Sequence, residues 1–227
     1  RCAILAIGSI NILCLSKFKF KIMKKIICAA VMAFCFSTGA IAQDKGTVEF
    51  GVNIGYNSST VSNSEDSADS SNGINAAFAA DYYFSKTWSI KAKLIYDQKG
   101  WDNGFLEDLD TGIVYNTDYN LTYMTVPVMA NWHFARKKNW YLNFGPYIGF
   151  LMNAEETRFN LDVKDGFNAT DFGLAFGVGV KIPVSDKLKI SLEYEGQSGM
   201  KNIFKESNED VFNSRWGLNV GVNFLMK

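Results

Sequence analysis

The chain has 227 residues, with 23 basic and 23 acidic side chains and no formal net charge. The first 42 residues contain six of the bases, none of the acids and all four cysteines, so the remainder carries 17 bases against 23 acids and no cysteine. This distribution excludes a disulfide scaffold, a zinc ribbon or a thiol enzyme in the body of the protein. It also argues against nucleic-acid binding, which needs a basic surface.

The N-terminal segment has the layout of a secretory signal. Met23-Lys24-Lys25 provides a charged start, and the apolar run that follows is shorter than the roughly 20 residues needed to cross a bilayer. Ala40-Ile41-Ala42 then supplies the small residues of a cleavage site. We expect residues 1–22 to be upstream read-through, residues 23–42 to be the signal peptide, and residues 43–227 to be the exported domain.

Eight segments of the exported domain alternate apolar and polar residues with the period of a β-strand. They lie at 48–56, 74–84, 88–97, 119–134, 140–150, 171–182, 188–195 and 215–226. None of them has a convincing helical period. The chain is therefore predicted to be all-β.

The connections between these segments alternate in length. Short turns lie at 85–86, 135–139 and 183–187, and longer polar stretches lie at 57–73, 100–119, 153–170 and 196–213. Short turns at one end and long loops at the other are typical of an up-and-down barrel, and an even strand number places both termini at the short-turn end. We predict an eight-stranded antiparallel up-and-down transmembrane β-barrel, whose short turns face the periplasm as in outer-membrane barrels.

Alternation alone leaves open whether the apolar face points outward into lipid or inward, as in a soluble lipocalin-like carrier. The apolar face carries many large aromatic rings, which would overfill the interior of an eight-stranded barrel. The polar face is rich in glycine, which suits a crowded interior. Trp88, Trp132 and Trp140 lie beside short turns, where an interfacial aromatic girdle is expected. These features favour the lipid-facing arrangement.

The charged side chains of the exported domain fall into three groups. The four long connections hold 15 acids and 4 bases, whereas the N-terminal stub, the short turns and the last residue hold 7 bases and 2 acids. The remaining six acids and six bases lie on the polar faces of strands: Glu49, Asp81, Asp97, Asp171, Glu193, Glu195, Lys91, Lys93, Lys99, Lys181, Lys189 and Arg215. Inside a closed barrel they would form a neutral network, since buried charges are tolerated only when paired. A solvated face would show the same balance.

Few residues offer catalytic chemistry. His133 is the only histidine, and it lies beside a short turn, at the end of the barrel opposite the outer rim. A nucleophilic enzyme needs such a base next to its nucleophile, and we expect a structural role for His133. Gly173, Gly177 and Gly179 do not form a phosphate loop because no helix follows them.

Acidic residues offer oxygen ligands and acid–base groups. The stretches 107–110 and 208–210 contain such oxygens but lack the spacing of a calcium loop. Glu193 and Glu195 resemble an acid–base pair, yet they lie on one strand beside Lys189, which favours an ion network. We therefore expect no catalytic, cofactor-binding or metal-binding residue, and no enzymatic activity.

Four short stretches resemble the small outer-membrane β-barrel domain family, often labelled PorT-like or "porin family" in Gram-negative envelopes. They are Gly51-Val52-Asn53-Ile54-Gly55-Tyr56, Tyr123-Met124-Thr125-Val126-Pro127-Val128, Gly145-Pro146-Tyr147-Ile148-Gly149-Phe150-Leu151, and Asp171-Phe172-Gly173 through Gly177-Val178-Gly179. The resemblance covers residues 46–227 and implies a barrel in the outer membrane. Pro127 and Pro146 fall within these motifs, so we interpret them as bulges rather than strand breaks.

Together these observations predict a non-enzymatic outer-membrane β-barrel protein with a plugged polar lumen and long acidic extracellular loops, in an envelope or surface-interaction role. A narrow pore for small solutes is the first alternative, and a soluble lipocalin-like ligand-binding barrel is the second. The expected partners are outer-membrane lipid and a protein or glycan bound through the loops, with no cofactor and no nucleic acid. The expected location is the cell outer membrane, reached after secretion across the inner membrane.

Overall fold

A computed structural model describes residues 45–62, 68–108, 112–206 and 210–226. The predicted read-through and signal segments, 1–22 and 23–42, lie outside these residues. Among the described residues, no helix is long and apolar enough to cross a membrane.

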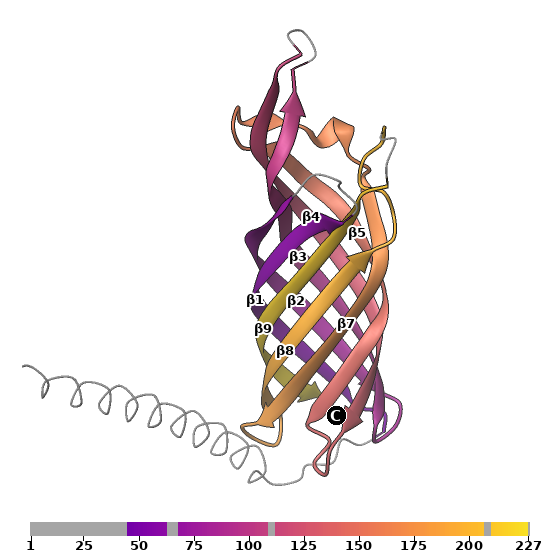
Figure 1. The fold of residues 1–227 in the computed structure, drawn as a ribbon. Coiled ribbons are helices and arrows are strands. Elements are labelled where there is room, and N and C mark those ends of the chain that lie inside the picture. Colours follow the sequence, from indigo (N-terminus) through magenta and orange to yellow (C-terminus); the bar gives the residue numbers. More distant parts are fainter. Residues whose placement is uncertain (1–44, 63–67, 109–111, 207–209, 227) are drawn as a thin grey trace, which may run out of the picture. The chain divides into compact units, whose positions relative to one another are not determined.

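Eight long antiparallel strands close into a barrel (Figure 1). They are β1 (Val48–Ser62), β2 (Asp69–Tyr83), β3 (Trp88–Glu107), β4 (Val114–Phe134), β5 (Trp140–Glu156), β7 (Thr170–Pro183), β8 (Leu188–Gly199) and β9 (Phe212–Met226). The two-residue β6 (Leu161–Asp162) pairs with the end of β5, and η1 (Lys164–Gly166) is a single 3-10 turn. Each long strand pairs with its neighbours along the chain, and β1 pairs with β9. The ring is therefore complete, which confirms the predicted eight-stranded antiparallel barrel.

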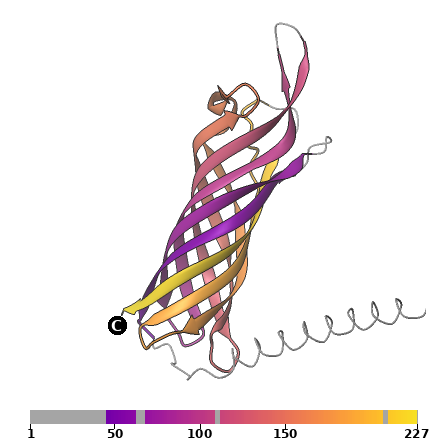
Figure 2. The same ribbon diagram turned by 90° about the vertical axis from the view of Figure 1, so that its left-hand side faces the viewer.

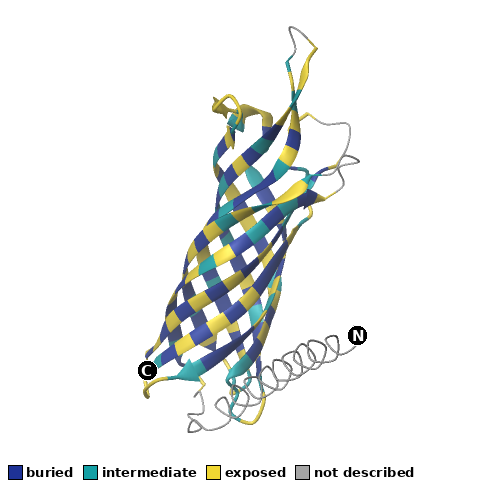
Figure 3. Cartoon of the chain, turned by 60° about the vertical axis from the view of Figure 1, so that its left-hand side comes forward, coloured by how far each residue is buried: buried dark blue, intermediate teal, exposed yellow. Residues whose placement is uncertain are grey.

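Buried and exposed residues alternate along every long strand (Figure 3). The apolar members point outward: Phe78 is 68% exposed and Ile54 is 68% exposed. The polar members point inward, and Arg215 and Asp97 are fully buried. The lipid-facing arrangement is thus confirmed, and the lipocalin-like alternative is wrong because its interior would have to be apolar.

Several strands continue well beyond the lengths predicted from hydrophobic alternation. β1 runs to Ser62 and β2 begins at Asp69, so most of the predicted loop at 57–73 is strand. β3 and β4 likewise extend through much of 100–119 as a hairpin that projects beyond the barrel (Figure 2). A transmembrane strand needs only about 9–11 residues. The extensions lie outside that length and are mostly polar, so their pairing leaves no apolar alternation to detect.

The interpretation of Pro127 and Pro146 as bulges was wrong. The β3–β4 register is the same on both sides of Pro127, from Ala92–Val128 to Ile95–Thr125. The β5–β7 register also passes through the Pro146–Leu174 pair without a shift. The strands instead omit individual rungs near these prolines, which lack an N–H to donate. The β4–β5 irregularity lies at Thr122/Tyr123.

A repeated pattern of glycine and asparagine closes the barrel between its first and last strands. β1 contains Gly51-x-Asn53-x-Gly55-x-Asn57 and β9 contains Gly217-x-Asn219-x-Gly221-x-Asn223. Antiparallel pairing sets each glycine of one strand opposite an asparagine of the other. A Cβ on Gly221 would overlap the Asn53 side chain, and one on Gly51 would overlap Asn223. Each asparagine therefore fills the space left by the glycine it faces, and we call this arrangement the glycine–asparagine ladder.

Candidate functional site

All twelve charges of the predicted network are buried in the lumen and all of them are paired. Eight form one chain of alternating sign, in the order Lys91, Glu193, Lys93, Glu195, Arg215, Asp97, Lys99 and Asp171. Arg215 lies at its centre, with Nε 3.0 Å from Asp97 Oδ1 and Nη1 2.9 Å from Glu195 Oε1. This outcome confirms the neutral lumen network.

The other four charges form a second neutral group. Lys181 Nζ lies 2.5 Å from Glu49 Oε1 and 2.8 Å from Asp81 Oδ2, and Lys189 Nζ lies 2.8 Å from Glu49 Oε2. Tyr141 lies between the two groups. Its hydroxyl donates to Glu193 Oε2 at 2.7 Å, and the Lys181 ammonium lies 5.4 Å from its ring centroid. The two groups together place six cations and six carboxylates inside the barrel with no net charge.

Inward-pointing tyrosines fill much of the space between these charges, and sequence reasoning missed them. Tyr83, Tyr123, Tyr141 and Tyr147 are each at most 3% exposed. The Tyr147 hydroxyl donates to Asp171 Oδ2 at 3.1 Å, and the Lys99 ammonium lies 5.1 Å from the Tyr147 ring centroid. An aromatic residue in an alternating segment suggests the apolar face. The available signal was position, because each of these tyrosines has the parity of a buried polar residue on its strand. These polar residues are Asp81 on β2, Asn131 on β4 and Asn143 on β5.

An apolar cluster lies at the outer end of the barrel. Trp101 and Tyr119, from β3 and β4, stack with ring centroids 4.7 Å apart. Phe167 and Ile203 reach the same cluster from connections between strands, and both are at most 3% exposed. Phe204 packs against Phe167 with centroids 4.9 Å apart. We call these five residues the outer plug. Predicting the stretches that contain them as polar loops overlooked this role.

The buried carboxyl group of Glu156, the last residue of β5, holds the start of the connection that follows this strand. Thr117 donates a hydrogen bond to Glu156, and the backbone N–H groups of Arg158 and Phe159 donate to it at 2.7 and 2.9 Å. Burial alone would raise the pKa of the Glu156 carboxyl, but these hydrogen bonds to its charged form lower the pKa below its ordinary value.

His133 has one feature of a nucleophile–base pair. Its Nε2 lies 2.9 Å from Ser89 Oγ, a partner that the sequence did not indicate. Both residues are fully buried, and within the described part of the chain His133 Nδ1 has no hydrogen-bond partner to orient the ring. The Tyr83 ring lies 4.9 Å from the imidazole. As far as the structure describes the chain, the pair thus lacks both access for a substrate and the third group of a catalytic triad.

The remaining candidates occupy structural positions. Gly177 faces Asn143 across the β5–β7 pair, and a Cβ on Gly179 would overlap Tyr141. Glu193 and Glu195 both bind Lys93 within the network. The acidic stretches 107–110 and 208–210 lie partly outside the described residues. Among the described residues, no group of three or more His, Cys, Asp or Glu side chains is arranged to hold a metal ion.

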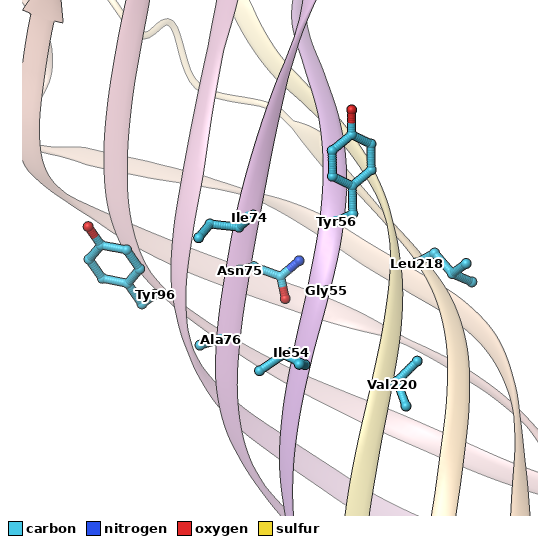
Figure 4. A pocket seen from close by; sticks show the side chains of 9 residues that line it. All are labelled: Ile54, Gly55, Tyr56, Ile74, Asn75, Ala76, Tyr96, Leu218 and Val220. Atoms are coloured by element: carbon cyan, nitrogen blue, oxygen red, sulfur yellow. The ribbon is translucent and has the colours of Figure 1, made fainter.

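The outer wall carries aromatic rings and shallow apolar grooves. Trp88 and Trp132 stack at the short-turn end with centroids 6.3 Å apart, in the predicted girdle position. A groove of about 490 Å³ crosses β9, β1, β2 and β3 (Figure 4). Ile54, Ile74, Tyr96 and Val220 flank it, and Ala76 leaves it open because its side chain is small. Its apolar lining matches the rest of the lipid-facing wall.

Comparison with known proteins gives one family and several structural neighbours. Residues 41–205, more than half of the chain, match the family model described as outer membrane protein beta-barrel domain, which confirms the resemblance found in the sequence. No curated protein matches the chain.

The outer membrane protein OprG from Pseudomonas aeruginosa is 11% identical over 82% of this chain and 98% of its own, with a TM-score of 0.50. Neisserial surface protein A is 14% identical over 79% of this chain and 99% of its own, with a TM-score of 0.48. Ail, the attachment invasion locus protein of Yersinia pestis, is 20% identical over 81% of this chain and 100% of its own, with a TM-score of 0.43. At these identities the likeness concerns the fold alone.

Proposed function

The chain belongs to the outer membrane protein β-barrel domain family and is an outer-membrane protein, and on this premise we propose that it is a non-enzymatic surface protein with a plugged lumen. The observation that carries the proposal is the network of twelve paired charges along the lumen. An eight-stranded barrel leaves an interior just wide enough for side chains. Here the charges, the inward tyrosines and the outer plug occupy that interior. The outer loops of the barrel are therefore the part of the protein that meets other molecules.

A narrow pore for small solutes is the second candidate, and one observation favours it. Several buried polar atoms in the outer half of the network have no hydrogen-bond partner among the described residues, including Lys99 Nζ, Asp171 Oδ1 and Arg215 Nη2. Buried groups of this kind are commonly satisfied by water. A file of water through the network would give a conductance path without a wide channel.

Electrical recording distinguishes the two candidates. Purified protein in a planar bilayer should show little or no steady conductance if the lumen is plugged. Stable, ohmic steps, small ones included, would refute the plugged barrel and support the pore. Trp101→Ala removes the central ring of the outer plug but leaves the charge network in place. If the network blocks the lumen, this variant should also show no steady conductance. Conductance in that variant alone would assign the seal to the outer plug instead.

We propose that the loops bind a protein or a glycan outside the cell. The long connections hold 15 acids and 4 bases, so an anionic partner would be repelled and a basic surface would be attracted. The β3–β4 hairpin extends this surface away from the barrel (Figures 1 and 2). Crosslinking from Asn103 in intact cells, followed by mass spectrometry, should recover the partner. A barrel that crosslinks only to lipid from this position would contradict a loop-binding role.

The expected processing is part of the same proposal. Residues 23–42 would direct export and be removed between Ala42 and Gln43. Mass spectrometry of the protein extracted from membranes should then find a chain that begins at Gln43. A membrane-inserted chain that retains Met23 or Arg1 would contradict the signal-peptide assignment.

A further inference from the structure

The short-turn end of the barrel carries a dense rim of positive charge. Six cations lie in the described stub and turns at 45–47, 84–87, 135–139 and 184–187: Lys45, Lys86, Arg136, Lys137, Lys138 and Lys187. Asp186 is the one acid in these described segments, which leaves 6 − 1 = 5 net positive charges. Lys86, Arg136 and Lys187 are exposed, and among the described residues none of them forms an ion pair with a carboxylate. A concentration of one sign of charge attracts the opposite sign.

The rim lies directly beside the aromatic girdle. Lys86 precedes Trp88 by two residues, and Arg136 follows Phe134 by two. Trp132 stacks on Phe134 with ring centroids 5.1 Å apart and on Trp88 at 6.3 Å. Amphipathic aromatic rings settle at the level of lipid headgroups. The cations on the adjoining turns are therefore at the depth of the lipid phosphates.

The backbone of the most basic turn is well defined. Ala135 and Lys138 both have a left-handed conformation, with φ of 66° and 53°, and the Lys138 N–H donates to the Ala135 carbonyl at 3.1 Å. Glycine adopts this conformation more readily than any residue with a side chain. The turn nevertheless has a cation rather than glycine at position 138, and it presents three consecutive basic residues beyond the end of β4.

We propose that this rim is a binding surface for anionic phospholipid headgroups in the adjoining leaflet. Ammonium and guanidinium groups form charge-assisted hydrogen bonds with phosphate oxygens, and basic residues near a membrane surface attract anionic lipids. The girdle explains why lipid is the partner rather than a soluble acidic protein, because the cations continue an apolar wall that acyl chains already cover. The proposal depends on the chain being a membrane barrel and is independent of whether the lumen conducts.

Lipid retention in bilayers of defined composition tests the proposal. The full chain would be reconstituted in phosphatidylcholine with and without phosphatidylglycerol, and the lipids it retains would be counted by native mass spectrometry. The turn variant combines Lys86→Glu, Arg136→Glu and Lys187→Glu. The matched control makes the same change in charge at the opposite end, with Arg158→Glu, Lys201→Glu and Lys205→Glu. Both leaflets are represented in the reconstituted bilayer, so the result does not depend on orientation.

The wild-type protein and the outer-end control should retain phosphatidylglycerol preferentially, and the turn variant should not. Each basic residue near an anionic surface contributes about fivefold to binding, so the preference should fall by roughly tenfold or more. Raising the salt concentration should weaken the wild-type preference, which provides a test even if the turn variant does not fold. An unchanged preference in the turn variant, a loss in the control variant alone, or a wild-type preference that is absent or insensitive to salt would overturn the proposal.

Discussion

Removing the charge of Arg215 should destabilise the barrel far more than removing an exposed charge. Arg215 is fully buried and pairs with Asp97 at 3.0 Å and with Glu195 at 2.9 Å. Arg215→Met keeps most of the volume of the side chain but leaves both carboxylates without their central partner. Breaking a buried ion pair on one side costs about 3–5 kcal/mol. At roughly 2–4 °C per kcal/mol for a domain of this size, the unfolding midpoint should fall by about 6–20 °C.

A second substitution separates the charge effect from a packing effect. Arg215→Met combined with Glu195→Gln restores a neutral lumen, because Asp97 retains Lys99 and Lys93 retains Glu193. We expect the double variant to recover at least half of the lost stability, which a double-mutant cycle would report as favourable coupling between the two positions.

Thermal unfolding in detergent micelles, followed by circular dichroism and gel mobility, would measure all variants. Lys205→Met is the control, since Lys205 is exposed on an outer loop. The reasoning fails if Arg215→Met unfolds at the same temperature as this control, or if the coupling is below about 0.5 kcal/mol.

Three further predictions concern closure, sidedness and pH. Gly221→Ala should lower the free energy of unfolding by about 1–3 kcal/mol, because the new Cβ would overlap the Asn53 side chain. Adding Asn53→Gly should restore most of that loss, and equal thermal stability of the single and double variants would contradict the ladder. A glutamate-specific protease added to whole cells should cut at Glu107, whereas trypsin should leave Arg136 to Lys138 intact, and the reverse pattern would mean an inverted barrel. Since the pKa of Glu156 is lowered on folding, the stability that it adds to the β5–β6 turn is present above its ordinary value of 4.5 and is lost as the pH falls through the lowered one. Proteolysis near Phe159 should therefore increase in acid, and Glu156→Gln should abolish that dependence on pH; an unchanged dependence in the variant would assign it to another group.

The sequence alone determined the number of strands, the direction of the apolar face and the membership of the lumen network. These properties follow from local alternation, because successive side chains of a strand point to opposite faces whatever the strand pairs with. Asp97 and Arg215, for example, could be assigned to the interior from their neighbours along the chain. The same rule failed beyond the membrane, where the polar and apolar residues of β3 and β4 follow no clear alternation and the buried face includes Trp101 and Tyr119.

Tertiary structure decided which residues meet. Lys91 pairs with Glu193, 102 positions away, only because the register of a closed ring brings their strands to opposite walls of one lumen. The glycine–asparagine ladder was visible as a repeat in two segments, yet its meaning depends on β1 pairing with β9. Phe167 and Ile203 join the apolar cluster at the outer end from connections that show no periodicity. Partner choice depends on register, closure and the folding of loops over the barrel, which are long-range properties that a local pattern of side chains does not contain.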